Sequence, residues 1–135
     1  MEHQSKRGGP VTTFQDLEVW QLGREIRRRL YLLARNLPDH ERYNLASQIR
    51  RAAVSLTANV AEGYGRFHFK ENIQYCRIAR GSAYKLIDHL IACQDENYLE
   101  KNEAESLHQE LLTFLRLLNG YIRSIGRAGN RQDGQ

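Results

Sequence analysis

Apolar residues recur every three or four positions along four stretches of this chain, and this spacing constrains the fold more than any other feature of the sequence. In an α-helix the spacing gathers apolar side chains into one stripe. Only two prolines occur, which is typical of a chain built from long helices. The first stripe consists of Val19, Leu22, Ile26, Leu30, Leu33 and Leu37. The periodicity predicts helices over Asp16–Asn36, Asp39–Ala61, Phe69–Gln94 and Glu100–Ile125.

Short polar connections separate the four predicted helices. Pro38 should end the first helix, because proline cannot continue the hydrogen-bond ladder, and Gly63 and Gly65 are expected to end the second. Connections of a few residues make consecutive helices antiparallel neighbours. We therefore expect an all-α, antiparallel up-down-up-down four-helix bundle over residues 14–125. Residues 1–13 and 126–135 are polar and contain glycine, so a flexible N-terminal arm and a flexible C-terminal tail are expected.

Little in the sequence indicates catalysis. No phosphate-binding glycine loop and no nucleophile motif is present. Glu105 and His108 have the Glu-x-x-His spacing of di-iron bundles, but such a site needs a second pair, which the sequence lacks. Cys76 and Cys93 lie on the apolar stripe of the third predicted helix, where buried reduced thiols are expected. We expect no enzyme activity, no cofactor and no metal site.

The hydropathy pattern bears on the compartment. No window holds the 18 or more apolar residues of a membrane span. The first ten residues are polar and lack the apolar segment of a secretory signal. We therefore expect a cytoplasmic protein with no membrane partner.

Charge is unevenly distributed along the chain. Between Arg24 and Arg51 there are eight arginines against three acidic residues, whereas between Asp95 and Glu110 there are six acidic residues against one lysine. A basic face can bind a nucleic-acid backbone, and opposite faces can also meet in a ring of subunits. An ordinary solvated surface is the third interpretation.

A second stripe on the first predicted helix interleaves arginines with aromatic residues. It consists of Trp20, Arg24, Arg28, Tyr31 and Arg35. Arginine and aromatic side chains on one face can contact phosphates and stack on bases, and the same composition suits a subunit interface. We assign nucleic-acid binding to Arg24, Arg28, Arg35, Arg50 and Arg51, and a subunit contact to Trp20 and Tyr31.

Small and polar residues inside the predicted helices also need a reason. Gly23, Gly81 and Gly120 lie mid-helix, where glycine costs about 1 kcal/mol relative to alanine. Tight packing within one bundle and contact with another subunit both account for them. Asn59 and Glu62 lie at the end of an apolar helix, and either face water or join a buried network with Arg66 or Arg80.

Several motifs together resemble a known family. They are Phe14-x-Asp16-Leu17-x-Val19-Trp20-Gln21, the run from Gln48 to Gly63 (QIRRAAVSLTANVAEG) followed by Arg66, and Ile78-Ala79-Arg80-Gly81-Ser82. They resemble the bacterial proteins encoded in intervening sequences of large-subunit ribosomal RNA genes, also called the S23 ribosomal protein family. Tyr84-Lys85 departs from the pattern, since an acidic residue is usual there.

The resemblance implies a four-helix bundle that assembles into a homopentamer, and it favours the buried network of Asn59, Glu62, Arg66 and Arg80. The chain is also similar to accessory proteins of diversity-generating retroelements, which work with a reverse transcriptase and RNA. We therefore expect a non-enzymatic oligomer whose basic surface binds RNA or DNA. The alternative is a protein-interaction scaffold without nucleic-acid affinity.

Overall fold

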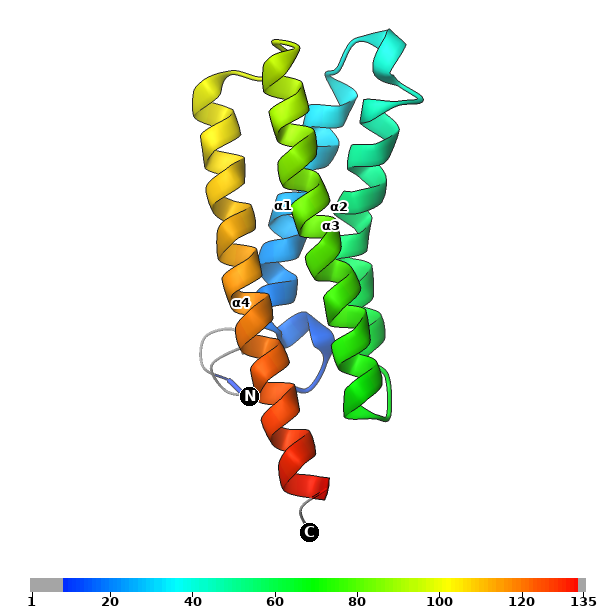
Figure 1. The fold of residues 1–135 in the computed structure, drawn as a ribbon, viewed down its shortest axis with the longest axis vertical. Helices are drawn as coiled ribbons and strands as arrows, with labels where there is room; N and C mark the ends of the chain where they lie inside the picture. The colour runs from blue at the N-terminus through cyan, green and yellow to red at the C-terminus, as the bar shows by residue number, and fades with distance from the viewer. Residues whose placement is uncertain (1–8, 134–135) are drawn as a thin grey trace.

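The protein is a four-helix bundle, as the sequence predicts. A computed structural model describes residues 9–133, with side chains as far as Asn130. Its helices are α1 (Glu18–Arg35), α2 (Leu45–Tyr64), α3 (Phe69–Asp95) and α4 (Lys101–Asp133). They run alternately up and down, and each contacts its two neighbours around the bundle (Figure 1). No β-strand occurs between residues 9 and 133.

The start of α2 differs from the sequence prediction. Residues Asp39–Glu41 form a short 3-10 helix (η4), and α2 begins only at Leu45. The Glu41 carboxylate explains the break, since its Oε1 accepts hydrogen bonds from the Leu45 backbone N–H at 3.4 Å and from the Asn44 side chain at 3.3 Å. These bonds satisfy a donor of the first turn of α2, as a helix cap does.

The ends of the chain also correct the prediction. The tail expected over residues 126–135 is helical as far as Asp133, so α4 extends beyond the other three helices (Figure 1). Gly129 is buried against the ring of Phe69 at the start of α3, which gives the extension a packing partner. Of the expected N-terminal arm, residues 1–8 lie outside the described residues. Val11 packs against the core, and a 3-10 helix (η3) covers Phe14–Asp16.

Apolar side chains from all four helices fill the interior. Phe114 and Tyr121 of α4 are its largest fully buried side chains. Trp20 is only 8% exposed, so the prediction that it lies on an outer face is wrong. The reason is η3, whose Phe14 packs edge-on against the indole with the ring centroids 5.2 Å apart.

Two interior glycines mark where helices approach most closely. A Cβ on Gly23 would lie 2.9 Å from Phe114 Cε1. Gly63, expected to end α2, is instead a buried residue inside it, and a Cβ there would lie 2.6 Å from Asn72 Oδ1 and 3.0 Å from the Asn72 carbonyl oxygen. Tight packing therefore explains both glycines, whereas a Cβ on Gly81 would meet nothing within 4 Å.

Replacing Gly63 with alanine should lower the free energy of unfolding by roughly 1–3 kcal/mol, the usual cost of overpacking. The added methyl group would meet α3 backbone, so α2 and α3 would have to move apart. Gly126→Ala in α4 is the matched control and should raise stability by up to about 1 kcal/mol, because alanine favours the helix and an added Cβ there would meet nothing within 4 Å. Urea unfolding at one protein concentration measures both. Equal stability of the two variants would contradict the close approach.

Both cysteines should be inert in the folded protein. Cys76 and Cys93 are buried, and burial raises the pKa of the Cys76 thiol to about 12 and that of Cys93 to about 11. At pH 8 the folded protein then holds roughly a thousandfold less thiolate at Cys76, and roughly a hundredfold less at Cys93, than the unfolded chain. We expect a chromogenic disulfide reagent to label neither cysteine in buffer and both in denaturant. Rapid labelling of either thiol in buffer would contradict this.

Candidate functional site

A groove between α1 and α2 contains two of the five arginines that the sequence predicts to act together, Arg50 and Arg51. It has a volume of about 480 Å³, and its lining contains no acidic residue. The lining residues are Tyr31, Arg42, Tyr43, Ser47, Arg50, Arg51 and Val54. Helical periodicity explains the α2 wall, since Ser47, Arg50, Arg51 and Val54 are spaced by one, three or four positions.

The groove continues in two directions. Along α1, a second hollow of about 250 Å³ is lined by Arg27, Arg28, Tyr31 and Arg35. At the corner where α1 turns into α2, a smaller hollow of about 140 Å³ has Arg35, Arg42 and Arg50 in its lining, together with Asp39. These hollows share Tyr31, Arg35, Arg42 and Arg50. We call the combined surface the arginine groove.

Four of the five arginines that the sequence assigns to nucleic-acid binding lie together in the structure. Arg28, Arg35, Arg50 and Arg51 line the arginine groove. Arg24 does not, because it lies near the start of α1, with its guanidinium 5.9 Å from the Trp20 ring centroid. Sequence reasoning missed Arg27, Arg42 and Tyr43. The dipeptide Arg42-Tyr43, placed between a proline and a new helix, was the available signal for two of them.

Positive charge in the arginine groove lacks acidic partners among the described residues. No ion pair within 4.0 Å joins any of its arginines to a described carboxylate. Arg27 is held by a 2.7 Å hydrogen bond from its guanidinium to Thr57 Oγ1. Arg29 lies outside the arginine groove and differs from the groove arginines, because it forms an ion pair with Glu110 of α4 at 3.3 Å. The groove therefore carries a concentrated positive field.

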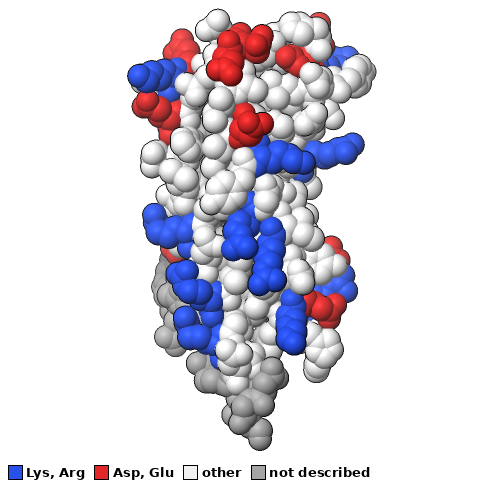
Figure 2. Space-filling view, in the orientation of Figure 1, with Lys and Arg blue, Asp and Glu red and all other residues white. Residues whose placement is uncertain are grey.

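Acidic residues gather elsewhere. They lie near the α3–α4 turn, at the top of Figure 2, whereas basic residues cover the lower half of the face formed by α3 and α4. The second half of α4 contributes Arg116, Arg123 and Arg127, all exposed. The division into one basic and one acidic half, expected from the sequence, is therefore incomplete, because α4 carries both signs.

Exposed apolar side chains lie both in the arginine groove and on α3. Tyr31, predicted as a subunit contact, is 36% exposed and lies in the arginine groove. On α3, Ile78, Tyr84 and Ile91 are 52%, 58% and 51% exposed, and the surface at Gly81 is open. Large exposed apolar side chains of this kind are typical of interaction surfaces.

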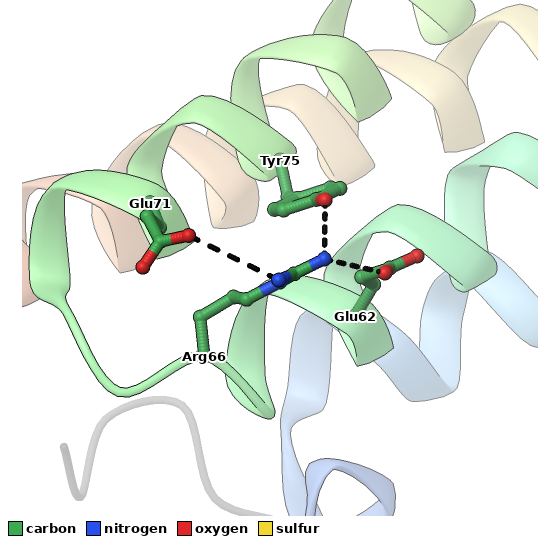
Figure 3. A network of polar contacts seen from close by, with 4 residues as sticks. All are labelled: Glu62, Arg66, Glu71 and Tyr75. Atoms are coloured by element: carbon green, nitrogen blue, oxygen red, sulfur yellow. Dashed lines mark hydrogen bonds and ion pairs between the residues drawn. The ribbon is translucent and has the colours of Figure 1, made fainter.

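The structure does not contain the single buried network predicted for Asn59, Glu62, Arg66 and Arg80. These residues form separate contacts, and the contact between Glu62 and Arg66 is exposed. Arg66 donates hydrogen bonds to Glu62 at 2.8 Å and to Tyr75 at 2.6 Å, and it lies 3.9 Å from Glu71 (Figure 3). The hydrogen bond with Glu62 raises the pKa of Arg66. Yet the Arg66 and Glu62 side chains are 37% and 53% exposed. These contacts tie the end of α2 to the start of α3.

The other two members of the predicted network lie apart. Asn59 donates to Ser55 Oγ at 2.7 Å, and Ser82 of α3 donates to the same oxygen at 2.6 Å. Arg80 donates to Asn119 of α4 at 3.0 Å. The sequence prediction failed here because Arg80 points from α3 toward α4, on the side of the helix away from α2.

A polar cluster at the other end of the bundle was not predicted. Tyr98, in the α3–α4 turn, donates a 2.9 Å hydrogen bond to Glu41 Oε2, and His40 Nε2 lies 3.0 Å from the same hydroxyl. The hydrogen bond from Tyr98 lowers the pKa of Glu41 and raises that of Tyr98. The cluster ties the connection between η4 and α2, which contains Arg42 and Tyr43, to the α3–α4 turn.

Glu105 and His108 are both exposed on α4, which agrees with a solvated face. Within residues 9–133, no three candidate ligands lie close enough together to hold a metal ion. In the same part of the chain, none of the helices combines the length and the apolar character that crossing a bilayer needs.

Comparison with known proteins identifies the family. No curated protein matches the chain significantly. A crystal structure from Bacteroides thetaiotaomicron, described as a protein with unknown function from the S23 ribosomal protein family, superposes with a TM-score of 0.72. It is 22% identical and the match covers 78% of this chain and 95% of that one, which supports the fold. The family model described as "23S rRNA-intervening sequence protein" matches residues 15–120, and the chain therefore belongs to this family.

Proposed function

We propose that this protein is a non-enzymatic, cytoplasmic, oligomeric protein that binds the backbone of RNA or DNA in the arginine groove. The observation that carries the proposal is the clustering of six arginines from α1, the η4–α2 connection and α2 without an acidic partner within 4.0 Å among the described residues. Like charges this close repel one another, and a polyanion in the groove would remove that repulsion. The arginines are Arg27, Arg28, Arg35, Arg42, Arg50 and Arg51.

The kind of cation supports a phosphate ligand. The lysines that the structure describes, Lys70, Lys85 and Lys101, all lie outside the lining of the groove. Arginine presents a planar fork of donors that matches phosphate oxygens, whereas lysine acts as a point charge. No element is shaped to read base edges in a duplex groove, so little sequence preference is expected.

The resemblance to accessory proteins of diversity-generating retroelements adds a specific partner to this proposal. A reverse transcriptase and its RNA would be the partners in that case. A pull-down with purified reverse transcriptase, in the presence and absence of RNA, addresses this directly.

Arg28→Glu combined with Arg50→Glu should weaken the binding of a labelled RNA at least about tenfold. The double variant should also lower the slope of log K against log salt concentration by roughly two, because each arginine displaces about one counterion. Fluorescence anisotropy across a salt series measures both quantities. Arg123→Glu combined with Arg127→Glu is the matched control, since it changes net charge equally on exposed positions of α4. An equal loss in the control pair would place the binding outside the groove.

The second candidate function is a protein-interaction scaffold. The observation that favours it is the exposure of three large apolar side chains on α3, Ile78, Tyr84 and Ile91. We propose the exposed surface of α3 as the contact between subunits, in place of Trp20, which is buried within the chain. Burying three large apolar side chains per subunit would stabilise an oligomer by several kcal/mol.

Light scattering coupled to gel filtration should give a mass of about five times 15.7 kDa if the homopentamer implied by the resemblance forms. Ile78→Glu combined with Ile91→Glu should dissociate it, because charges would be buried at the contact. Leu112→Glu, at a 40% exposed position of α4, serves as the control and should leave the mass unchanged. A wild-type monomer at micromolar concentration would contradict the assembly. Dissociation by Arg28→Glu with Arg50→Glu would make the arginine groove the subunit contact.

A further inference from the structure

Tyr43 is the most unusual side chain of the arginine groove. It is 88% exposed, although its ring is large and flat. It lies at the edge of the groove, in the connection between η4 and α2, and the Arg42 guanidinium is 5.9 Å from its ring centroid. An exposed aromatic ring beside a cation offers a stacking surface that the folded chain itself leaves uncovered.

The position of Tyr43 is fixed on both sides. Before it, Glu41 accepts the hydrogen bond from Tyr98 and so ties the connection to the α3–α4 turn. After it, the Asn44 backbone N–H donates to the Glu41 carbonyl oxygen at 3.0 Å, and α2 begins at Leu45. The backbone that carries the ring is therefore held in place. A ligand that stacks on it would lose little free energy to ordering of the protein.

Apolar and cationic surfaces alternate across the groove. Tyr31 from α1 and Val54 from α2 contribute apolar lining and are 36% and 40% exposed. Arg50 and Arg51 lie between Tyr43 and Val54 in the α2 wall, and Arg35, Arg42 and Arg50 surround the corner hollow. A nucleotide has the same two parts, since its base is flat and its phosphate is anionic.

We infer that the arginine groove is specific for an unpaired nucleic-acid strand, with a base stacked on Tyr43 and phosphates on the surrounding arginines. This inference rests on the proposed function and adds the form of the ligand. Within a duplex both faces of each internal base are covered by neighbouring bases, so away from the duplex ends an aromatic side chain can stack only on a base that is unpaired. A duplex would contact the arginines alone and would leave Tyr43 unused.

The test compares four labelled probes of equal length by fluorescence anisotropy at low salt. They are a single RNA strand, a single DNA strand, the corresponding duplex and an abasic strand that keeps the phosphates without the bases. Either single strand should bind about tenfold more tightly than the duplex and the abasic strand, the range expected for base–aromatic stacking. The two single-stranded arms identify whether RNA or DNA is preferred. Equal affinity for single strand, duplex and abasic strand would overturn the inference.

Variants locate the effect. Tyr43→Ala should weaken single-strand binding about tenfold and leave duplex binding unchanged, whereas Tyr43→Phe, which keeps the ring, should bind like the wild type. Phe67→Ala removes another exposed aromatic ring, 90% exposed between α2 and α3 and outside the groove, and should have no effect. If Tyr43→Ala matches Phe67→Ala while Arg28→Glu with Arg50→Glu abolishes binding, the stacking inference fails and the proposed function stands. If the wild type binds none of the probes, both fail.

Discussion

The close packing of α1 against α2 and α4 at Gly23 is the contact on which the arginine groove depends. A Cβ at this position would lie 2.9 Å from Phe114 and 3.3 Å from Thr57, so a larger residue would push α1 outward. One turn further along α1, Arg27 bonds the same Thr57 of α2. These contacts keep the two helices near enough for Tyr31 on α1 and Arg50 on α2 to line one groove.

Charge is distributed unevenly, both between opposite faces of the bundle and between the two ends of α4. The arginine groove lies between α1 and α2, on the opposite side from the α3–α4 face, because the helices contact one another in chain order around the bundle. On α4, Glu103 lies in the first turn, where the helix dipole favours acidic residues, and Arg123 and Arg127 lie toward the other end. Of the groove arginines, Arg35 lies in the last turn of α1, where the dipole favours basic residues. Arg50 and Arg51 have no such explanation, since they lie far from the C-terminal end of α2.

Sequence reasoning was most accurate where the side-chain pattern is periodic. It found the four helices and the stripes of Arg28 with Arg35 and of Arg50 with Arg51, because helical periodicity decides which residues share a face. It was wrong for Trp20, which Phe14 of η3 covers, and for the C-terminal segment, where Gly129 packs against Phe69. Both errors arose at contacts between residues outside the periodic stripes. The network assigned to Asn59 and Arg80 failed for a related reason, since the sequence does not show which neighbouring helix a flanking residue faces.

The sequence by itself therefore determined the helices, their antiparallel order and the inward faces, because hydrophobic periodicity and short connections leave few alternatives. Only the tertiary structure decided which outer faces adjoin. It brought Arg42 and Tyr43 beside Tyr31 and Arg50, it separated Arg24 from them, and it tied η4 to Tyr98 across the end of the bundle. The physical reason is that the rotation of each helix about its axis is set by close contacts such as those at Gly23 and Gly63, and the spacing of residues along one helix contains no information about the atoms of another.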